Sequence, residues 1–350
     1  KFEQTLATLV GAEHAVAVNS GTSAIHLACL ALGVGPGDHV WTSPITFVAS
    51  ANAPLYCGAT VDFVDVDPTT NNLCTTALRK KLESASKVNA LPKVVIPVHL
   101  AGHSCDMVEI QNLAQEFGFS VIEDAAHALG SSYAEHPIGS CKYSDITIFS
   151  FHPVKTITTG EGGAATTNDA GLAKKMEQLR SHGVTRDSSS FVSEDTPLWG
   201  YEQHALGFNY RLSDLAASLG TTQLSKLNDF IQRRRSLAER YFNLLVDSHL
   251  ELPDPKYLTS SAWHLFIVSV PGGRHSRDEI FKTMRSRHVG VNLHYPPVHL
   301  QPFYRERGFN PGDFPVAEAY AQRAITLPLH PGLHQRDVCH VASVLLELTS

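Results

Sequence analysis

No apolar run in this chain of 350 residues is long enough to span a bilayer, and no basic cluster exceeds Arg233 to Arg235. The formal net charge is −6, which argues against a nucleic-acid surface. Charged residues make up only 18% of the chain and hydrophobic residues 43%, so disorder is not expected. These shortages predict a soluble, folded protein that binds neither membranes nor nucleic acids.

Patterns that bind metals or form disulfides are also missing. The six cysteines include no CxxC pair, and the 19 histidines include no HExxH motif. We therefore expect reduced thiols in a cytoplasmic protein, no metal site, and structural roles for His99, His103 and His152. Lys1 to Val10 has the pattern of an amphipathic helix and not of a signal peptide.

What is present is an alternation of strand-like and helix-like stretches, which predicts an α/β fold with a mostly parallel sheet. The strand-like runs cover residues 15–18, 39–44, 61–67, 94–100, 120–125 and 147–151. A long helical pattern over 213–246, interrupted at Gly220, is expected to link two lobes. We thus predict a large domain over 1–212, linking helices over 213–246 and a small C-terminal α/β domain over 247–350.

The stretch SFHPVKTITTGEGG, Ser150 to Gly163, places Lys155 between an apolar strand and a glycine-rich turn. A buried, partly deprotonated lysine can form a Schiff base with a carbonyl compound. The glycines allow the backbone to pass close to a bound ring. For a lone lysine a solvated loop position would be the better interpretation, but two further motifs favour covalent chemistry.

The first of these motifs is VIEDAAHALG, Val121 to Gly130, in which an apolar strand ends at Asp124 and His127 follows three residues later. A carboxylate at a strand end faces a cleft, and the pyridine nitrogen of pyridoxal phosphate (PLP) requires such a partner. Alone, Asp124 could equally cap the next turn while His127 packs beside it.

The second motif is NSGTSAIHLACLALG, Asn19 to Gly33, where a strand runs through a polar turn into a helix. Free backbone amides and the helix dipole attract an anion to this turn, and the hydroxyls of Thr22 and Ser23 add donors. This pattern predicts a phosphate cradle. Ordinary N-capping would explain the same residues without a ligand, so only the conjunction of the motifs decides.

These motifs, together with SPITFVAS (Ser43 to Ser50), TTGEGG and FNYRLSD (Phe208 to Asp214), resemble the DegT-like sugar-nucleotide aminotransferases of the fold-type-I PLP superfamily. The resemblance covers nearly the whole chain and keeps every block in order. It implies a large domain whose mostly parallel seven-stranded sheet lies between helices, a smaller C-terminal α/β domain, and pyridoxal 5'-phosphate as the cofactor.

Carried over residue by residue, the resemblance implies that Lys155 holds the cofactor as a Schiff base and shuttles protons. Asp124 would pair with the pyridine nitrogen, and His127 would lie near the ring hydroxyl. Phe47 would stack on the ring. The remaining roles fall on residues that would bind the phosphate: Thr22, Ser23, Ser150 and, from the neighbouring subunit, Asn209.

Substrate contacts are implied for Gly21, Ser150 and Asn209, and for His294 and Tyr295 in the segment VNLHYPPVHLQPFYRERGF. This segment resembles the members that make UDP-4-amino-4,6-dideoxy-N-acetyl-β-L-altrosamine for pseudaminic acid, a sugar of flagellin glycosylation. The implied partners are a UDP-linked keto sugar, L-glutamate as amino donor, and a second subunit in a homodimer with shared active sites.

Three alternatives stay open. A dehydratase of the same fold would carry histidine in place of Lys155, so it ranks well below transamination. An aminotransferase for a different UDP, dTDP or GDP sugar is the main competitor, and a non-catalytic PLP-binding regulator is the third. The resemblance also implies a further helix and a nucleotide-binding loop before Lys1, and a mobile loop over 185–202 near the partner's site.

Overall fold

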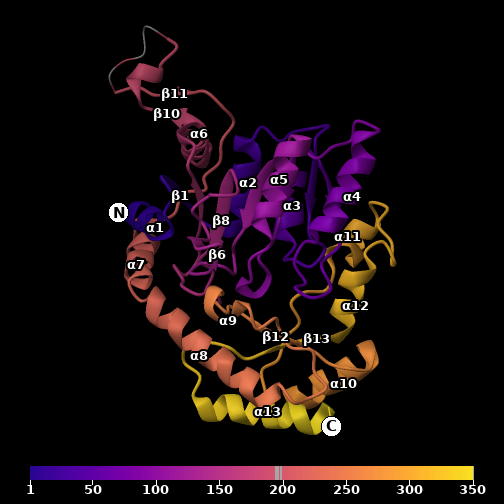
Figure 1. The fold of residues 1–350 in the computed structure, drawn as a ribbon. Helices are drawn as coiled ribbons and strands as arrows, with labels where there is room; N and C mark the ends of the chain where they lie inside the picture. The colour runs from indigo at the N-terminus through magenta and orange to yellow at the C-terminus, as the bar shows by residue number, and fades with distance from the viewer. Residues whose placement is uncertain (194–196, 198, 350) are drawn as a thin grey trace.

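The computed structural model, which describes residues 1–193, 197 and 199–349, is built around a seven-stranded sheet (Figure 1). In spatial order the strands are β1 (His14–Val18), β9 (Gly163–Thr167), β8 (Ile146–Ser150), β5 (Ser120–Asp124), β4 (Val94–Ile96), β2 (His39–Thr42) and β3 (Thr60–Phe63). The six strand-like runs each supply one strand. The seventh, β9, consists of small residues and threonine, so its sequence lacks the usual apolar signal of a buried strand.

The prediction of a mostly parallel sheet is confirmed. The strands from β3 to β8 pair in parallel, whereas β9 is antiparallel to both β8 and β1. Strands β1, β5 and β8 therefore run in one direction and end at the same edge of the sheet. That edge is where ligands collect in open α/β folds.

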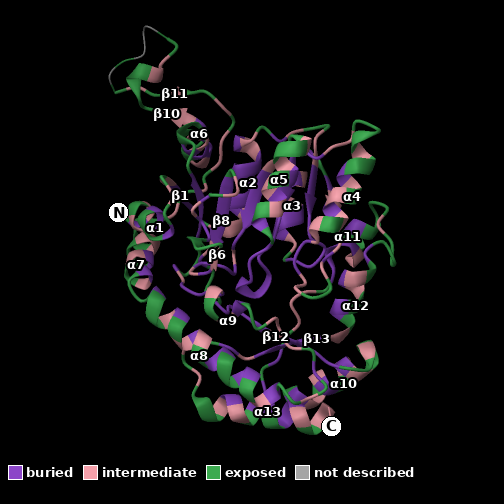
Figure 2. Cartoon of the chain, in the orientation of Figure 1, coloured by how far each residue is buried: buried purple, intermediate pink, exposed green. Residues whose placement is uncertain are grey.

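Both faces of the sheet are buried, and its strands are mostly coloured as buried in Figure 2. Successive side chains on a strand point to opposite faces, so a strand such as β4 contributes to two hydrophobic clusters. On β4, Val94 and Ile96 pack with helices α2, α3 and α6, whereas Val95 packs with α4 and α5 on the opposite face. The helices of this part of the chain are α1 (Phe2–Val10), α2 (Gly21–Ala31), α3 (Ala49–Tyr56), α4 (Thr75–Ser86), α5 (Met107–Phe117), α6 (Ala170–Arg180) and α7 (Asp214–Leu224). Short elements are η1 (Leu100–Gly102), β6 (Ser132–Tyr133), β7 (His136–Pro137) and η2 (Ser188–Ser190).

Gly220 does not interrupt the helical pattern, so that expectation is wrong. It lies buried inside α7, and the break comes later, between α7 and α8 (Leu227–Leu245). A Cβ atom at position 220 would lie 2.6 Å from the ring of Phe2. The glycine is therefore explained by close packing of α7 against α1.

The C-terminal lobe contains a two-stranded antiparallel sheet covered by helices. Its elements are α9 (Tyr257–Ser260), β12 (Phe266–Ser269), α10 (Gly273–Ser286), η3 (Val298–Leu300), α11 (Pro302–Arg305), α12 (Pro315–Arg323), β13 (Ala324–Leu327) and α13 (Gln335–Thr349). Helix α8 serves two cores: Leu227 and Ile231 pack with α1, whereas Leu237 and Leu245 pack around the C-terminal strands. The division at 212 and 247 remains a prediction.

Backbone groups tie the C-terminal lobe to the large sheet. The carboxylate of Asp65, just after β3, accepts hydrogen bonds from the amides of Val316 (3.0 Å) and Ala317 (2.9 Å) in the first turn of α12. The amide of Val298 donates to the carbonyl of Pro44, beyond β2 (2.9 Å). The segment that precedes Val298 is thereby fixed over the carboxyl edge of the sheet.

A hairpin of β10 (Val184–Thr185) and β11 (Glu202–Gln203) projects from the body at the upper left of Figure 1. The loop expected over 185–202 lies here, and its residues 194–196 and 198 fall outside the described residues. All six cysteines are free thiols. No described helix combines the length and hydropathy of a membrane span.

Candidate active site

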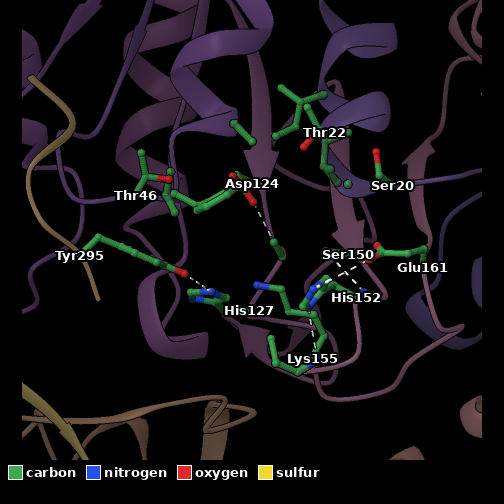
Figure 3. A pocket seen from close by; sticks show the side chains of 18 residues that line it. Ser20, Thr22, Thr46, Asp124, His127, Ser150, His152, Lys155, Glu161 and Tyr295 are labelled. Carbon is green, nitrogen blue, oxygen red and sulfur yellow. Dashed lines mark hydrogen bonds and ion pairs between the residues drawn. The ribbon is translucent and has the colours of Figure 1, made fainter. Parts of the chain in front are cut away.

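A cavity of about 300 Å³ opens at the carboxyl edge of the sheet (Figure 3). It brings together the ends of β5 and β8, the first turn of α2 and the segment before η3. Of the residues predicted from sequence, Gly21, Thr22, Phe47, Asp124, His127, Ser150, Lys155 and Tyr295 line it. Ser23, Asn209 and His294 do not.

Lys155 follows β8 in a tight turn, where its amide donates to the carbonyl of His152 (2.9 Å). Its side chain extends into the cavity among Asp124, His127 and Ser150 (Figure 3). Burial lowers the pKa of the Lys155 amine to about 8, and the negative charge of Asp124 partly opposes this shift. A substantial neutral fraction near pH 8 makes the amine a nucleophile, which the turn sequence alone could not establish.

Asp124 is the last residue of β5, and its buried carboxylate is held from two sides. Its Oδ2 accepts a 2.5 Å hydrogen bond from the hydroxyl of Ser50, and its Oδ1 accepts from the amide of Ala126 (3.1 Å). The hydroxyl of Ser50 also lies 2.8 Å from that of Thr46. Ser50 and Thr46 belong to the TFVAS motif, but nothing in their spacing from Asp124 predicted this contact.

The preceding residue, Glu123, anchors the same strand on the opposite face. Its carboxylate accepts hydrogen bonds from His99 Nε2 (2.7 Å), Thr147 (3.1 Å) and Ser144. Every one of these donors lies on the far side of β5 from the cavity, because successive side chains on a strand point to opposite faces. The anchored strand end gives Asp124 little freedom to move.

The start of α2, where the sequence predicts a phosphate cradle, lies against the end of β8. A Cβ atom on Gly21 would lie 3.0 Å from Cβ of Ser150, so a larger residue would push the helix away from β8. Ser20 caps the helix by accepting from the amide of Ser23 (3.1 Å). The hydroxyl of Ser23 donates to Asn19 Oδ1 (2.6 Å) instead of lining the cavity. The amides of Gly21 and Thr22 remain the first-turn donors nearest to a ligand.

His127, Tyr295 and Phe47 form the wall opposite the cradle. The hydroxyl of Tyr295 lies 3.0 Å from Nε2 of His127, and the two rings are nearly parallel. Burial and the positive charge of Lys155 lower the pKa of His127 well below its usual value, so the ring is neutral. The side chain of Phe47 is 59% exposed at the mouth of the cavity, so a bound ligand would cover a large apolar surface there.

Asn209 and His294, predicted as site residues, lie outside the cavity lining, whereas His152 contributes to it. Asn209 is exposed and pairs with Ser181 in an isolated bridge. His294 bonds Thr326 through Nδ1 (2.9 Å), and burial lowers its pKa to about 4. His152, assigned a structural role from sequence, lines the cavity beside Glu161, with 3.9 Å between its Nε2 and Oε1 of Glu161. The roles assigned to the predicted residues stay predictions.

The DegT/DnrJ/EryC1/StrS aminotransferase family model matches residues 1–346. The chain belongs to this family. It is a PLP-dependent sugar aminotransferase of fold type I, as the sequence resemblance implied.

Relatives of this aminotransferase match it over nearly their whole length. The spore coat polysaccharide biosynthesis protein SpsC of Bacillus subtilis (strain 168) is 39% identical, over 99% of this chain and 88% of SpsC. The aminotransferase PseC of Helicobacter pylori, involved in biosynthesis of pseudoaminic acid, is 29% identical with a TM-score of 0.88, over 99% of this chain and 90% of PseC. Spr1654 of Streptococcus pneumoniae in its PLP form is 30% identical with a TM-score of 0.88 and the same coverage.

The cavity of this aminotransferase fits PLP, the cofactor of the family. The first turn of α2 suits the phosphate group of PLP, because a helix N-terminus attracts anions. The carboxylate of Asp124 suits the pyridine nitrogen of the ring. The buried Nδ1 atom of His127 has no hydrogen-bond partner among the described residues, as expected where a ligand completes the hydrogen bonding. Lys155 would hold the cofactor covalently.

Proposed function

We propose that this aminotransferase moves the amino group of L-glutamate to C4 of UDP-2-acetamido-2,6-dideoxy-β-L-arabino-hex-4-ulose. The product would be UDP-4-amino-4,6-dideoxy-N-acetyl-β-L-altrosamine, a precursor of pseudaminic acid for flagellin glycosylation in the cytoplasm. One observation supports the reaction type: the amine of Lys155, with a pKa of about 8, lies in the same cavity as Asp124. The sugar is supported by the sequence likeness around Tyr295 and by the similarity to PseC.

The chain's own residues explain how the reaction would proceed. When bound, PLP supplies an electron sink that stabilises a carbanion next to the transferred nitrogen. Lys155 Nζ accepts and returns the proton at that carbon, because its lowered pKa allows both steps near neutral pH. Asp124, held by Ser50, would pair with the ring nitrogen. The amides at the start of α2 and the hydroxyl of Ser150 would hold the phosphate.

A homodimer with shared sites belongs to the same proposal. Large apolar side chains stand exposed at three places: Val154 (63%) in the cavity lining, Leu206 (84%) between β11 and α7, and Leu215 (86%) in α7. Such side chains are expected where a second subunit covers them. Asn209, exposed and outside the cavity of its own chain, would then reach the phosphate in the partner's cavity.

A second candidate is an aminotransferase for another nucleotide sugar. It is favoured by the identity of 39% to SpsC, a spore coat polysaccharide protein, against 29% to PseC. The two candidates share every residue that handles the cofactor and differ only in the sugar.

A single-turnover experiment tests the proposal. The protein, loaded with pyridoxamine phosphate, is mixed separately with the UDP-linked 4-keto sugars of L-arabino and D-xylo configuration. Return of the visible absorption of PLP reports transfer. Selective reaction with the L-sugar is expected, and selective reaction with the D-sugar would assign the second candidate. Reaction with neither, in a protein that binds the cofactor, would reject both sugars.

A further inference from the structure

Tyr295 is the C-terminal lobe's contribution to the cavity, and the family resemblance assigns it only to the sugar nucleotide. Its hydroxyl lies 3.0 Å from Nε2 of His127. Among the described residues, His127 is the hydrogen-bond partner of this hydroxyl. The contact joins a residue beyond β12 to one beyond β5, and Figure 3 shows it at the wall of the cavity.

We propose that Tyr295 is a positioning residue: its hydroxyl donates to Nε2 of His127 and thereby keeps the proton of that ring on Nδ1, as a donor for the cofactor. The inference rests on the PLP chemistry of the proposed function. It concerns the state of His127, not the choice of sugar.

Both His127 and Tyr295 are neutral. Burial lowers the pKa of His127, and the charge of Lys155 lowers it further. Burial raises the pKa of the Tyr295 phenol, and the carboxylate of Asp124 adds to this rise. A neutral imidazole carries one proton, and a neutral phenol carries one, so the contact has only two possible arrangements.

The two arrangements differ in which partner donates the shared hydrogen bond. If Nε2 of His127 donated to Tyr295, the phenol proton would have no acceptor within the described part of the protein. The other arrangement leaves the Nδ1 proton unpaired in the cofactor-free protein, so the strength of the shared hydrogen bond decides: a phenol donates more strongly than a neutral imidazole, and an imidazole nitrogen accepts more strongly than a phenol oxygen. If Tyr295 donates to Nε2, its proton is satisfied and the imidazole proton moves to Nδ1. Nδ1 is buried and has no hydrogen-bond partner in the part of the chain that the structure describes. A neutral N–H group there suits an anionic oxygen of the cofactor ring.

Neighbouring residues hold Tyr295 and His127 in place. The hydroxyl of Tyr320 donates to the carbonyl of His294 (2.7 Å), and His294 bonds Thr326. His264 packs against the ring of His127, with 4.5 Å between the ring centres. The titratable groups around His127 are thus Tyr295, His264, His294, His103 and Lys155. Burial also lowers the pKa of both His264 and His294, so these rings stay neutral.

Nitrogen NMR on the complete, cofactor-free protein tests the inference directly. With ¹⁵N-histidine labelling, the signals of His127 are assigned by their loss in His127→Gln. We expect the native protein to carry the proton on Nδ1, and Tyr295→Phe to shift a large part of the population to Nε2. A native ring protonated at Nε2, or a Tyr295→Phe ring unchanged from native, would overturn the inference.

The cofactor spectrum gives a second readout. Loss of a donor to the ring oxygen should raise the pH midpoint of the visible absorption band of bound PLP by roughly 0.5 to 1 in Tyr295→Phe. Tyr304→Phe is the matched control, because it removes another buried phenol, one that donates to Asn52 away from the cavity. Its midpoint should equal the native one.

These outcomes separate the inference from the proposed function. An unchanged midpoint and tautomer in Tyr295→Phe, with a raised KM for the keto sugar alone, would assign Tyr295 to the substrate and reject the positioning role. Failure of every keto sugar to react would reject the proposed function. The NMR test of the His127 tautomer uses no sugar, so its result would still decide the positioning role of Tyr295.

Discussion

Lys155 is the side chain whose ionisation matters most, because only its neutral amine can attack the cofactor's carbonyl. Its pKa is lowered to about 8, so the amine is mostly protonated at lower pH and gains reactivity as pH rises through that value. We expect the rate of PLP capture by the cofactor-free protein to rise about tenfold per pH unit below pH 8 and to level off above it.

Stopped-flow absorption between about pH 6 and about pH 10 measures this rate. A rate that continues to rise up to the pKa of an ordinary lysine would contradict the lowered pKa. Lys155→Ala is the control, because it lacks the amine that reacts with PLP. This variant should bind the cofactor without covalent attachment and show no turnover.

Ser50 was not predicted as a site residue, yet it donates the shortest hydrogen bond to Asp124. Replacing it in Ser50→Ala leaves Oδ2 of a buried carboxylate with no protein donor among the described residues. Hydrogen bonds to charged groups contribute about 1.5–3 kcal/mol, so we expect PLP to bind at least about tenfold more weakly. Equilibrium titration of the cofactor-free protein, followed by absorption, provides the dissociation constant.

The control for Ser50→Ala is Thr42→Val. Thr42 is equally buried and its hydroxyl donates to the carbonyl of Ile96 (2.8 Å), but it does not touch Asp124. This variant should lose stability and keep its PLP affinity. Equal loss of affinity in both variants would mean that Ser50 matters only for packing.

At the scale of elements, the contact between Asp65 and α12 joins the large sheet to the C-terminal lobe. A carboxylate at a helix N-terminus stabilises both the free amides and the helix dipole. We expect Asp65→Ala to lower the free energy of unfolding by about 1–2 kcal/mol, as measured by urea denaturation.

Asp62→Ala provides the comparison, because Asp62 lies three residues earlier, within β3, and pairs with Lys81 in a partly exposed salt bridge. Such pairs contribute about 0–1 kcal/mol. If the two variants lose the same stability, the cap on α12 is no more important than a surface ion pair.

At the scale of the whole molecule, the proposed homodimer places Lys155 and Asn209 of one site on different chains. Lys155→Ala and Asn209→Ala proteins should each be nearly inactive. After subunit exchange, a mixed dimer would contain one site with both native residues, so an equal mixture should regain about one quarter of native activity. Native mass spectrometry checks that exchange has occurred, and a fully exchanged mixture without activity would reject shared sites.

Much of the fold followed from local patterns. The six strand-like runs and the amphipathic helix α1 all appear in the structure, because apolar periodicity acts over a few residues. Strand β9 gave no such signal, and Gly220 was misinterpreted, since both depend on packing against segments distant in sequence.

The sequence by itself determined the chemistry of this protein: a lysine, a strand-end carboxylate and a helix N-terminus in fixed order predicted PLP binding. Only the tertiary structure decided how those groups are tuned. Burial lowers the pKa of Lys155, Ser50 reaches Asp124 across 74 positions, and Tyr295 reaches His127 across 168. Desolvation and hydrogen bonds between distant residues exist only after the chain has folded, so no local pattern could predict them.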